Sequence, residues 1–174
     1  MSEVATKEPE KGFAGVNQYL TFCLGQEEYG IELLKVQEIK GYSAITPIPN
    51  TPPHIKGVMN LRGAVIPVVD LRIRFGMEAI EYTQFNVIIV INVGTKVMGL
   101  LVDAVSDVLN AGAGEIRPAP DFGARADTRF ISGMAAAGDK VAVLLDIDSL
   151  LTEADLAAGD EAASAASAQT DAQA

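Results

Sequence analysis

The chain has 174 residues, of which 49% are hydrophobic, and it carries a formal charge of -10 and a single cysteine. This length suits one domain or two very small ones. No run of about 18 uncharged apolar residues predicts a membrane span, and one cysteine excludes an internal disulfide. The N-terminus lacks the apolar core of a signal peptide, so we expect a cytoplasmic protein without direct membrane insertion.

Much of the acidity lies outside the body of the chain. Residues 1–18 carry -1 and residues 152–174 carry -5, which leaves -4 for the body. Nucleic-acid phosphates require a basic stripe, and an acidic body argues against such a partner. The polar residues 1–17 predict a flexible arm. Residues 152–174, acidic and rich in alanine, predict a disordered tail.

The first part of the chain predicts a hairpin and then a mixed strand. Apolar alternation indicates a strand over residues 19–24 with a partner over 29–31, and residues 33–35 favour a brief helical turn. On the strand that follows, Val36 and Glu38 share one face. A valine beside a glutamate is compatible with a half-exposed strand or with a surface that a partner covers.

Residues 55–75 predict a strand, a tight turn, a second strand and a short helical turn, after a proline-rich extended connection over 45–53. Pro67 cannot donate a ladder hydrogen bond, so the second strand is expected to be an edge strand or a bulged one. Arg62 stands beside Gly63 at the turn. It is either a solvated turn charge or a guanidinium that reaches past the sheet.

Much of this pattern recurs later in the chain, which indicates an internal duplication with repeats of about 19–75 and 86–151. The recurring positions, at offsets of 69 and then 76 residues, include Phe22/Ile91, Gly25/Gly94, Gly30/Gly99, Glu38/Asp107, Gly57/Gly133 and Asp70/Asp146. Two repeats of this size are marginal alone, so we expect them to share one core.

The second repeat predicts strands over 87–93 and 97–102, a shorter unit over 103–109, strands over 130–134 and 141–146, and a short helix over 147–151. Residues 110–128 predict a long loop rich in glycine and proline, which is typical of a binding surface. In this loop Arg117, Asp121 and Phe122 stand out. Phe122 either tucks into the core or anchors an interface.

Catalytic options are few. Asp70 and Asp146 occupy matching places in the repeats, which is compatible with a shared-proton dyad. Each also follows an apolar strand and precedes a helical turn, and that placement favours a helix N-cap. His54 is the only histidine, and the sequence has no phosphate-binding loop. We therefore expect no catalytic residue, no metal and no cofactor.

Short strands separated by glycine turns, with little helix, predict an all-β barrel or sandwich. The motifs narrow this prediction, because they resemble the CheW family of bacterial chemotaxis coupling proteins over about residues 18–151. The segments that carry the resemblance are Glu28-Tyr29-Gly30-Ile31, Val36-Gln37-Glu38-Ile39, Ile55-Lys56-Gly57-Val58, Asn60-Leu61-Arg62-Gly63, Pro67-Val68-Val69-Asp70-Leu71 and Glu115-Ile116-Arg117-Pro118-Ala119-Pro120.

The resemblance implies two five-stranded SH3-like or OB-like barrels on a shared core, with strands exchanged between the repeats. It also implies a non-enzymatic adaptor that links the cytoplasmic tips of methyl-accepting chemotaxis receptors to the regulatory domain of the histidine kinase CheA. Such a protein would be recruited to membrane receptor arrays at the cell pole.

The same resemblance implies two groups of site residues. Those for receptor binding or signal coupling are Val36, Glu38, Arg62 and Val87, and those for kinase binding are Gly57, Arg117 and Phe122. Residue types alone leave Val36 and Gly57 open between the two partners.

Two other classes compete with this interpretation. An OB-type binder of single-stranded nucleic acid would need stacking aromatics and a basic groove, whereas the chain has no tryptophan and its body is acidic. A duplicated acid hydrolase would use Asp70 and Asp146, and a buried Asp70 acting as a helix cap would argue against it.

Overall fold

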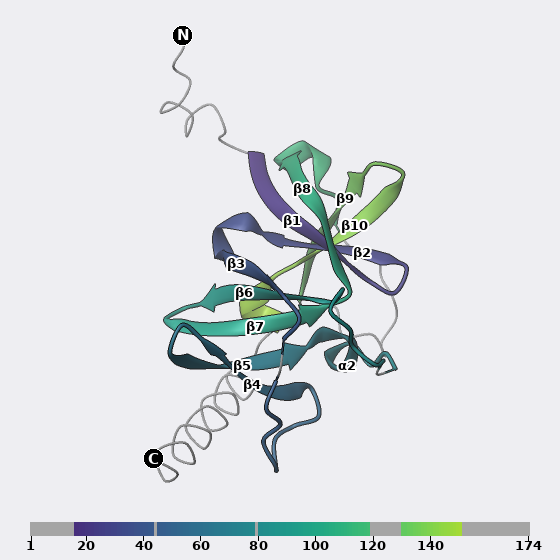
Figure 1. The fold of residues 1–174 in the computed structure, drawn as a ribbon. Helices are drawn as coiled ribbons and strands as arrows, with labels where there is room; N and C mark the ends of the chain where they lie inside the picture. Colours follow the sequence, from purple (N-terminus) through teal and green to yellow (C-terminus); the bar gives the residue numbers. More distant parts are fainter. Residues whose placement is uncertain (1–15, 44, 79, 119–129, 151–174) are drawn as a thin grey trace.

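The computed structural model describes residues 16–43, 45–78, 80–118 and 130–150. Two five-stranded sheets, here called sheet A and sheet B, lie one above the other (Figure 1). In spatial order, sheet A contains β8 (Ala104–Gly112), β1 (Val16–Leu24), β2 (Glu27–Glu32), β10 (Lys140–Leu145) and β9 (Ile131–Ala137).

Sheet B has the order β3 (Val36–Gly41), β6 (Val87–Val93), β7 (Lys96–Val102), β5 (Ala64–Asp70) and β4 (Ile55–Leu61). The helical elements are one-turn pieces, namely η1 (Leu33–Lys35), α2 (Leu71–Arg74), η2 (Ala113–Glu115) and α3 (Ile147–Leu150). None of the helices among the described residues is long and apolar enough to cross a membrane. The predicted all-β class with two five-stranded subdomains is confirmed.

The two sheets repeat one another down to the register. Each sheet draws strands from both halves of the chain, and the offsets found in the sequence map the strand order of one sheet onto that of the other. The parallel ladder pairs Val68 with Gly99 in sheet B and Leu144 with Gly30 in sheet A. The bulge between Val36 and Glu38 has its counterpart opposite Thr21 and Phe22 of β1. The predicted duplication with exchanged strands is therefore present in the fold.

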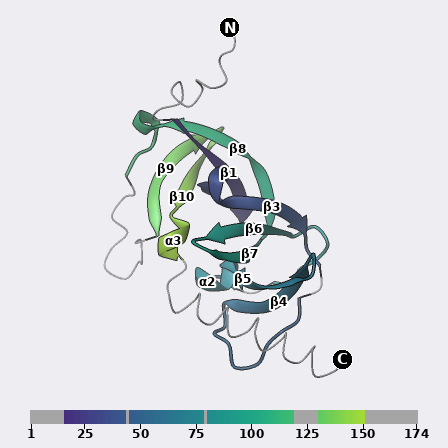
Figure 2. The ribbon, with the colours of Figure 1, turned by 90° about the vertical axis from the view of Figure 1, so that its left-hand side faces the viewer.

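One apolar core lies between the sheets and takes side chains from both. Its buried members include Phe22, Leu24, Ile31 and Leu145 from sheet A and Ile55, Val69, Ile89, Ile91 and Leu100 from sheet B. Figure 2 shows the strongly curved strands of sheet A above sheet B, with α3 beside the junction. Neither sheet could bury its inner face alone, which explains why the repeats share a core.

Each sheet also encloses a smaller cluster of its own, and the two clusters differ in size. In sheet B the cluster contains large side chains, among them Met59, Leu61 and Ile66. The matching positions in sheet A are alanines, with Ala135, Ala137 and Ala142 in place of those three residues. A pocket of about 340 Å³ lies beside the alanine cluster.

The expectation that the Pro67 strand lies at an edge or carries a bulge is wrong. Strand β5 lies between β7 and β4, and the bulge in this hairpin is on β4. Pro67 faces Val58, whose backbone N–H and C=O both bond to Thr46 at 2.9 Å and so point away from β5. The missing N–H of Pro67 is thus directed to the other side, where the ladder with β7 begins only at Val68.

Strand boundaries also differ from the prediction at two places. Strand β1 begins at Val16, inside the expected arm, and β8 continues to Gly112, inside the expected loop. The two extensions pair with each other, Val16 with Gly112 and Gln18 with Asn110. The rest of the predicted arm and the predicted tail over 152–174 lie outside the described residues.

Candidate interaction surfaces

The hairpin turn between β4 and β5 holds Arg62 in an unusual backbone conformation. Leu61 pairs with Ala64, and both turn residues have positive φ, 50° at Arg62 and 91° at Gly63. This geometry matches a type I′ turn, in which the first position favours asparagine or glycine and not arginine. The Asn60 Oδ1 atom accepts a hydrogen bond from the Gly63 N–H at 3.1 Å. The turn therefore keeps Arg62 against its local preference.

The Arg62 guanidinium reaches from this turn to Glu38 on β3. Arg62 Nη1 donates to Glu38 Oε1 at 3.1 Å, and Nη2 pairs with Oε2, so the contact is bidentate. The hydrogen bond from Arg62 lowers the pKa of Glu38, and the same bond raises the pKa of Arg62. Since 66% of the Arg62 side chain is exposed, the pair contributes little to stability. It instead presents two oriented charges to solvent.

Val36 and Val87 lie at opposite ends of the β3–β6 ladder, where Val36 faces Ile91 and Val87 faces Gly41. Both valines are half-buried and pack against the shared core. Exposure alternates along β3, with Val36 and Glu38 half-buried and Gln37 and Ile39 exposed, which is compatible with the half-exposed strand considered from the sequence. All four residues therefore belong to sheet B, where Glu38 and Arg62 are in direct contact and the two valines lie at the two ends of the ladder.

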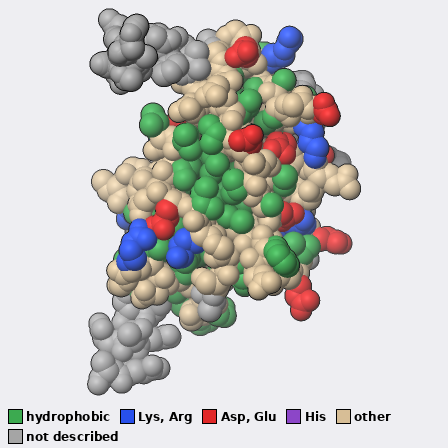
Figure 3. Space-filling view, turned by 45° about the horizontal axis from the view of Figure 1, so that its top comes forward, with side chains coloured by type: hydrophobic (Ala, Val, Ile, Leu, Met, Phe, Trp, Pro, Cys, Tyr) green, Lys and Arg blue, Asp and Glu red, His purple; other side chains and the backbone are tan. Residues whose placement is uncertain are grey.

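Hydrophobic side chains are also exposed on the surface of the molecule. Figure 3 shows a continuous apolar patch across one face, bordered by acidic and basic side chains. The large hydrophobic residues with substantial exposure among the described residues are Leu34, Ile39, Ile80, Phe85, Val108 and Val141. Apolar surface framed by charges is typical of a protein–protein interaction face.

Gly57 is buried in β4, on the same sheet as Val36, Glu38, Arg62 and Val87. Its φ is 154°, and a Cβ atom there would lie 2.2 Å from the Thr46 carbonyl oxygen. A substitution at Gly57 would therefore act by displacing the 45–47 backbone. The structure does not bring Gly57 together with Arg117, which lies on the other sheet.

Arg117 occupies the place in sheet A that Thr46 occupies in sheet B. Its backbone exchanges two 2.8 Å hydrogen bonds with Met134, as Thr46 does with Val58. The Arg117 side chain is exposed and lines the 340 Å³ pocket, whose apolar walls include Met134, Ala135 and Val141. Phe122 lies outside the described residues.

The two matched aspartates are helix caps, as predicted. Asp70 Oδ1 accepts hydrogen bonds from the N–H groups of Arg72 and Ile73 at 3.1 and 3.4 Å. Asp146 Oδ1 accepts from Asp148 N–H at 3.1 Å. Asp70 is buried and also accepts a 2.5 Å hydrogen bond from the Tyr82 hydroxyl. The partial burial of Tyr82 raises its pKa, and this hydrogen bond raises it further. These contacts explain both carboxylates without a catalytic role.

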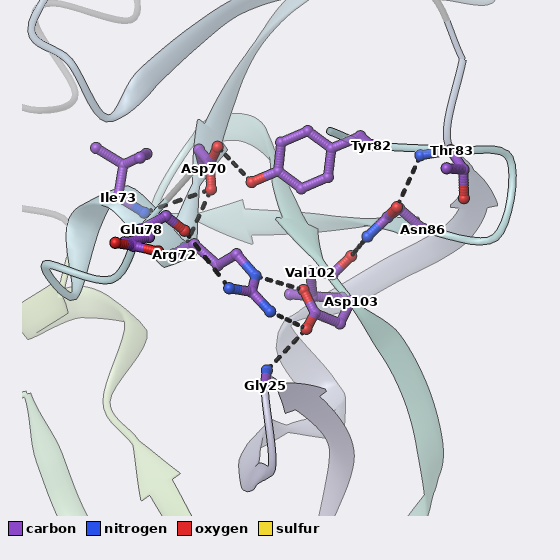
Figure 4. Close-up of polar contacts among 10 residues, drawn as sticks. All are labelled: Gly25, Asp70, Arg72, Ile73, Glu78, Tyr82, Thr83, Asn86, Val102 and Asp103. Atoms are coloured by element: carbon purple, nitrogen blue, oxygen red, sulfur yellow. Dashed lines mark hydrogen bonds and ion pairs between the residues drawn. The ribbon is translucent and has the colours of Figure 1, made fainter. Parts of the chain in front are cut away.

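Sequence reasoning missed a second ion pair, drawn in Figure 4. Arg72 Nε and Nη2 donate to the two carboxylate oxygens of Asp103 at 2.8 and 2.6 Å, and the Gly25 N–H donates to Asp103 Oδ2 at 2.7 Å. The hydrogen bond from Arg72 lowers the pKa of Asp103 and raises that of Arg72 itself. The sequence feature that could have indicated this pair is Asp103 itself, an acid that directly follows a buried strand and precedes no helix that it could cap.

Both the sequence and the fold of this chain match those of known proteins. The family model for the CheW-like domain matches residues 18–155. The chain belongs to the CheW family. It is similar to the chemotaxis protein CheW of Klebsiella aerogenes, with 45% identity over 163 residues that cover 94% of this chain and 98% of that protein. Members of this family are chemotaxis scaffold proteins.

Two further relatives agree with this membership of the CheW family. The chemotaxis protein CheW of Rhizobium meliloti is 40% identical over 136 residues, which cover 78% of this chain and 88% of that protein. The crystal structure of the scaffolding protein TtCheW from Thermoanaerobacter tengcongensis superposes with a TM-score of 0.72 at 34% identity, covering 80% of this chain and 94% of that one.

Proposed function

We propose that this protein is a non-enzymatic adaptor that couples the cytoplasmic tips of methyl-accepting chemotaxis receptors to the histidine kinase CheA. The observation that carries the proposal is the Glu38–Arg62 pair, which joins a positive-φ turn to β3, an edge strand of sheet B. Membership of a chemotaxis scaffold family supports it. The protein would act in the cytoplasm and be recruited to receptor arrays at the cell pole.

The receptor-facing surface would consist of Val36, Glu38, Arg62 and Val87. A receptor helix can lay an apolar stripe against the two half-buried valines, which flank Glu38 along the β3–β6 ladder. The paired charges would then set the register of the helix, because charge complementarity gives specificity more than affinity.

The kinase-facing surface would use Arg117 and Phe122, and Arg117 lines the pocket beside the alanine cluster. The Arg117 guanidinium is exposed next to apolar walls, a combination that suits a partner segment with one carboxylate and one apolar side chain. Gly57 would contribute indirectly, by fixing the 45–47 backbone.

A reconstitution tests this proposal. Receptor-containing membranes, CheA and ATP are mixed with and without the protein, and kinase phosphorylation and co-sedimentation are measured together. We expect attractant-sensitive activation of the kinase only when the protein is present, and its loss with Arg62→Ala. Absence of binding to both partners would contradict the proposal, as would full activation by Arg62→Ala.

A further inference from the structure

The two proposed surfaces lie on different sheets, with Arg62 on sheet B and Arg117 on sheet A. A rigid link between the sheets would be needed to keep those surfaces in one geometry. We propose that Arg72 and Asp103 are positioning residues that hold sheet A in a fixed orientation on sheet B, and that coupling depends on this clamp. The inference rests on the proposed function.

The Asp103 carboxylate joins three segments of the chain (Figure 4). Arg72 belongs to α2, which follows β5 of sheet B, and Gly25 belongs to the β1–β2 turn of sheet A. Asp103 itself lies where the chain leaves β7 of sheet B and enters β8 of sheet A, and its N–H donates to the Cys23 carbonyl at 3.1 Å. Both sheets are therefore bonded to one residue.

The clamp supplies direction, which the shared core does not. Apolar burial is roughly proportional to area and has no preferred angle. A bidentate arginine–carboxylate pair is short and geometrically specific. The Arg72 and Asp103 side chains are 13% and 20% exposed, so solvent screens this pair much less than it screens the Arg62 pair.

The base of the clamp is itself fixed. Asp70 accepts the Arg72 N–H and the Tyr82 hydroxyl, so α2 is tied to the connection between the repeats. At the end of that connection, buried Asn86 donates from Nδ2 to the Val102 carbonyl at 3.3 Å, one residue before Asp103. The residue after Asn86 is Val87, so the clamp is continuous with the proposed receptor surface.

The fold contains a natural control for this pair. In the second repeat the position that matches Arg72 is Asp148. Asp148 pairs with Lys35, which is the sequence neighbour of the position that matches Asp103. This contact has reversed charges, a single distance of 3.2 Å, and side chains that are 31% and 58% exposed. An exposed pair with one bond restrains orientation weakly, so breaking it should leave the sheets in place.

A distance measurement tests the clamp independently of signalling. Spin labels at Thr95→Cys and Asp139→Cys, both exposed turn positions on opposite sheets, are placed in a Cys23→Ser background. Asp103→Asn keeps an oxygen for the Gly25 N–H but loses the charge that holds Arg72. We expect a broadened or shifted distance distribution in Asp103→Asn and in Arg72→Lys, and an unchanged one in Asp148→Asn.

The same variants are then assayed in the reconstitution. We expect Asp103→Asn to lower receptor-controlled kinase activity about tenfold, while its affinity for each partner alone stays within about twofold. Wild-type distances and activity in Asp103→Asn would overturn the inference. So would a parallel loss of both affinities, since the residue would then maintain the surfaces themselves. Failure of the wild-type protein to activate the kinase would instead overturn the proposed function, and the distance distributions would still decide whether the clamp orients the sheets.

Discussion

Sheets A and B share strand order, register and bulge, yet they differ where side chains meet solvent or fill space. Sheet B carries Glu38 and Arg62, whose counterparts in sheet A are Asp107 and Gly138 and cannot form the same pair. Sheet A has alanines and an open pocket where sheet B is filled. The comparison teaches that the duplication specifies the fold, and departures from it mark the candidate sites.

The largest expected effect concerns the two matched glycines. Gly57→Ala forces a Cβ against the Thr46 carbonyl at positive φ, and we expect a loss of about 3 kcal/mol or more in the free energy of unfolding. At Gly133 an added Cβ would lie 2.6 Å from Ile116 Cγ2 and 3.0 Å from the Arg117 carbonyl oxygen, but the backbone there is not at positive φ. Gly133→Ala should therefore cost less, about 1–2 kcal/mol. Urea unfolding measures both, and equal costs would contradict the comparison.

The apolar clusters of the two sheets should differ in how strongly they respond to a change in side-chain volume. Met59→Ala removes a buried side chain from the filled cluster of sheet B and should cost about 2–4 kcal/mol. Ala135→Met adds the same side chain at the matching position in sheet A, next to the pocket, and should change stability by less than about 1 kcal/mol. Calorimetry would refute this asymmetry if Ala135→Met were the more damaging change.

The two capping aspartates should also contribute unequally to stability, with the larger contribution from Asp70, which follows sheet B. Asp70→Ala removes a buried cap and leaves the hydroxyl of half-buried Tyr82 without its acceptor, which we expect to cost about 2–3 kcal/mol. Asp146 is an exposed cap, so Asp146→Ala should cost about 1 kcal/mol. Tyr82→Phe serves as the control, because it removes the hydroxyl and leaves the Asp70 cap in place. A larger loss in Asp146→Ala would contradict the assignment.

The Asp103 clamp predicts a dependence of stability on pH. The pKa of Asp103 is lowered in the folded state, so its stabilisation is complete above the unfolded value of about 3.9 and is lost as the pH falls through the folded pKa. Asp103→Asn should therefore be less stable than wild type at pH 7 by about 1.5 kcal/mol. That difference should shrink near pH 2.5 in urea unfolding, and a constant difference would count against the ion pair.

The smallest effect on stability is expected at the exposed pair. Arg62→Ala should leave the midpoint of thermal unfolding unchanged, because the pair is solvated and its geometry is held by the turn and not by the charges. Circular dichroism checks this directly. A marked fall in the midpoint would show that Arg62 has a structural role and would weaken its assignment as an interaction residue.

The sequence predicted local features better than long-range ones. Strand alternation, the glycine turns and the Asp70 cap depend on neighbouring residues, and all three were found as predicted. The place of Pro67 was not predicted, because it depends on where the ladder with β7 begins. The predicted end of strand β8 was too early, because Asn110 to Gly112 has the composition of a turn. These residues are held in the strand by pairing with β1, which lies 92 or more residues earlier in the chain.

In the candidate sites, too, local features could be predicted from the sequence and long-range contacts could not. The tight turn identified Arg62, but its partner Glu38 is brought to it only by the sheet. The Arg72–Asp103 contact links residues 31 positions apart, just past the ends of the neighbouring strands β7 and β5, and the place of Asp103 after a buried strand does not indicate its partner. The roles of Val36, Val87, Gly57, Arg117 and Phe122 remain predictions from the family resemblance.

The most direct test of the division between sheets is a pair of binding measurements. Wild type, Arg62→Ala and Arg117→Ala are each titrated against receptor-containing membranes and, separately, against the isolated regulatory domain of CheA. We expect Arg117→Ala to lose affinity for the kinase domain only, and Arg62→Ala to retain kinase binding while failing to couple the receptor. Loss of kinase binding in Arg62→Ala, with Arg117→Ala unaffected, would contradict the assignment of the two surfaces to the two sheets.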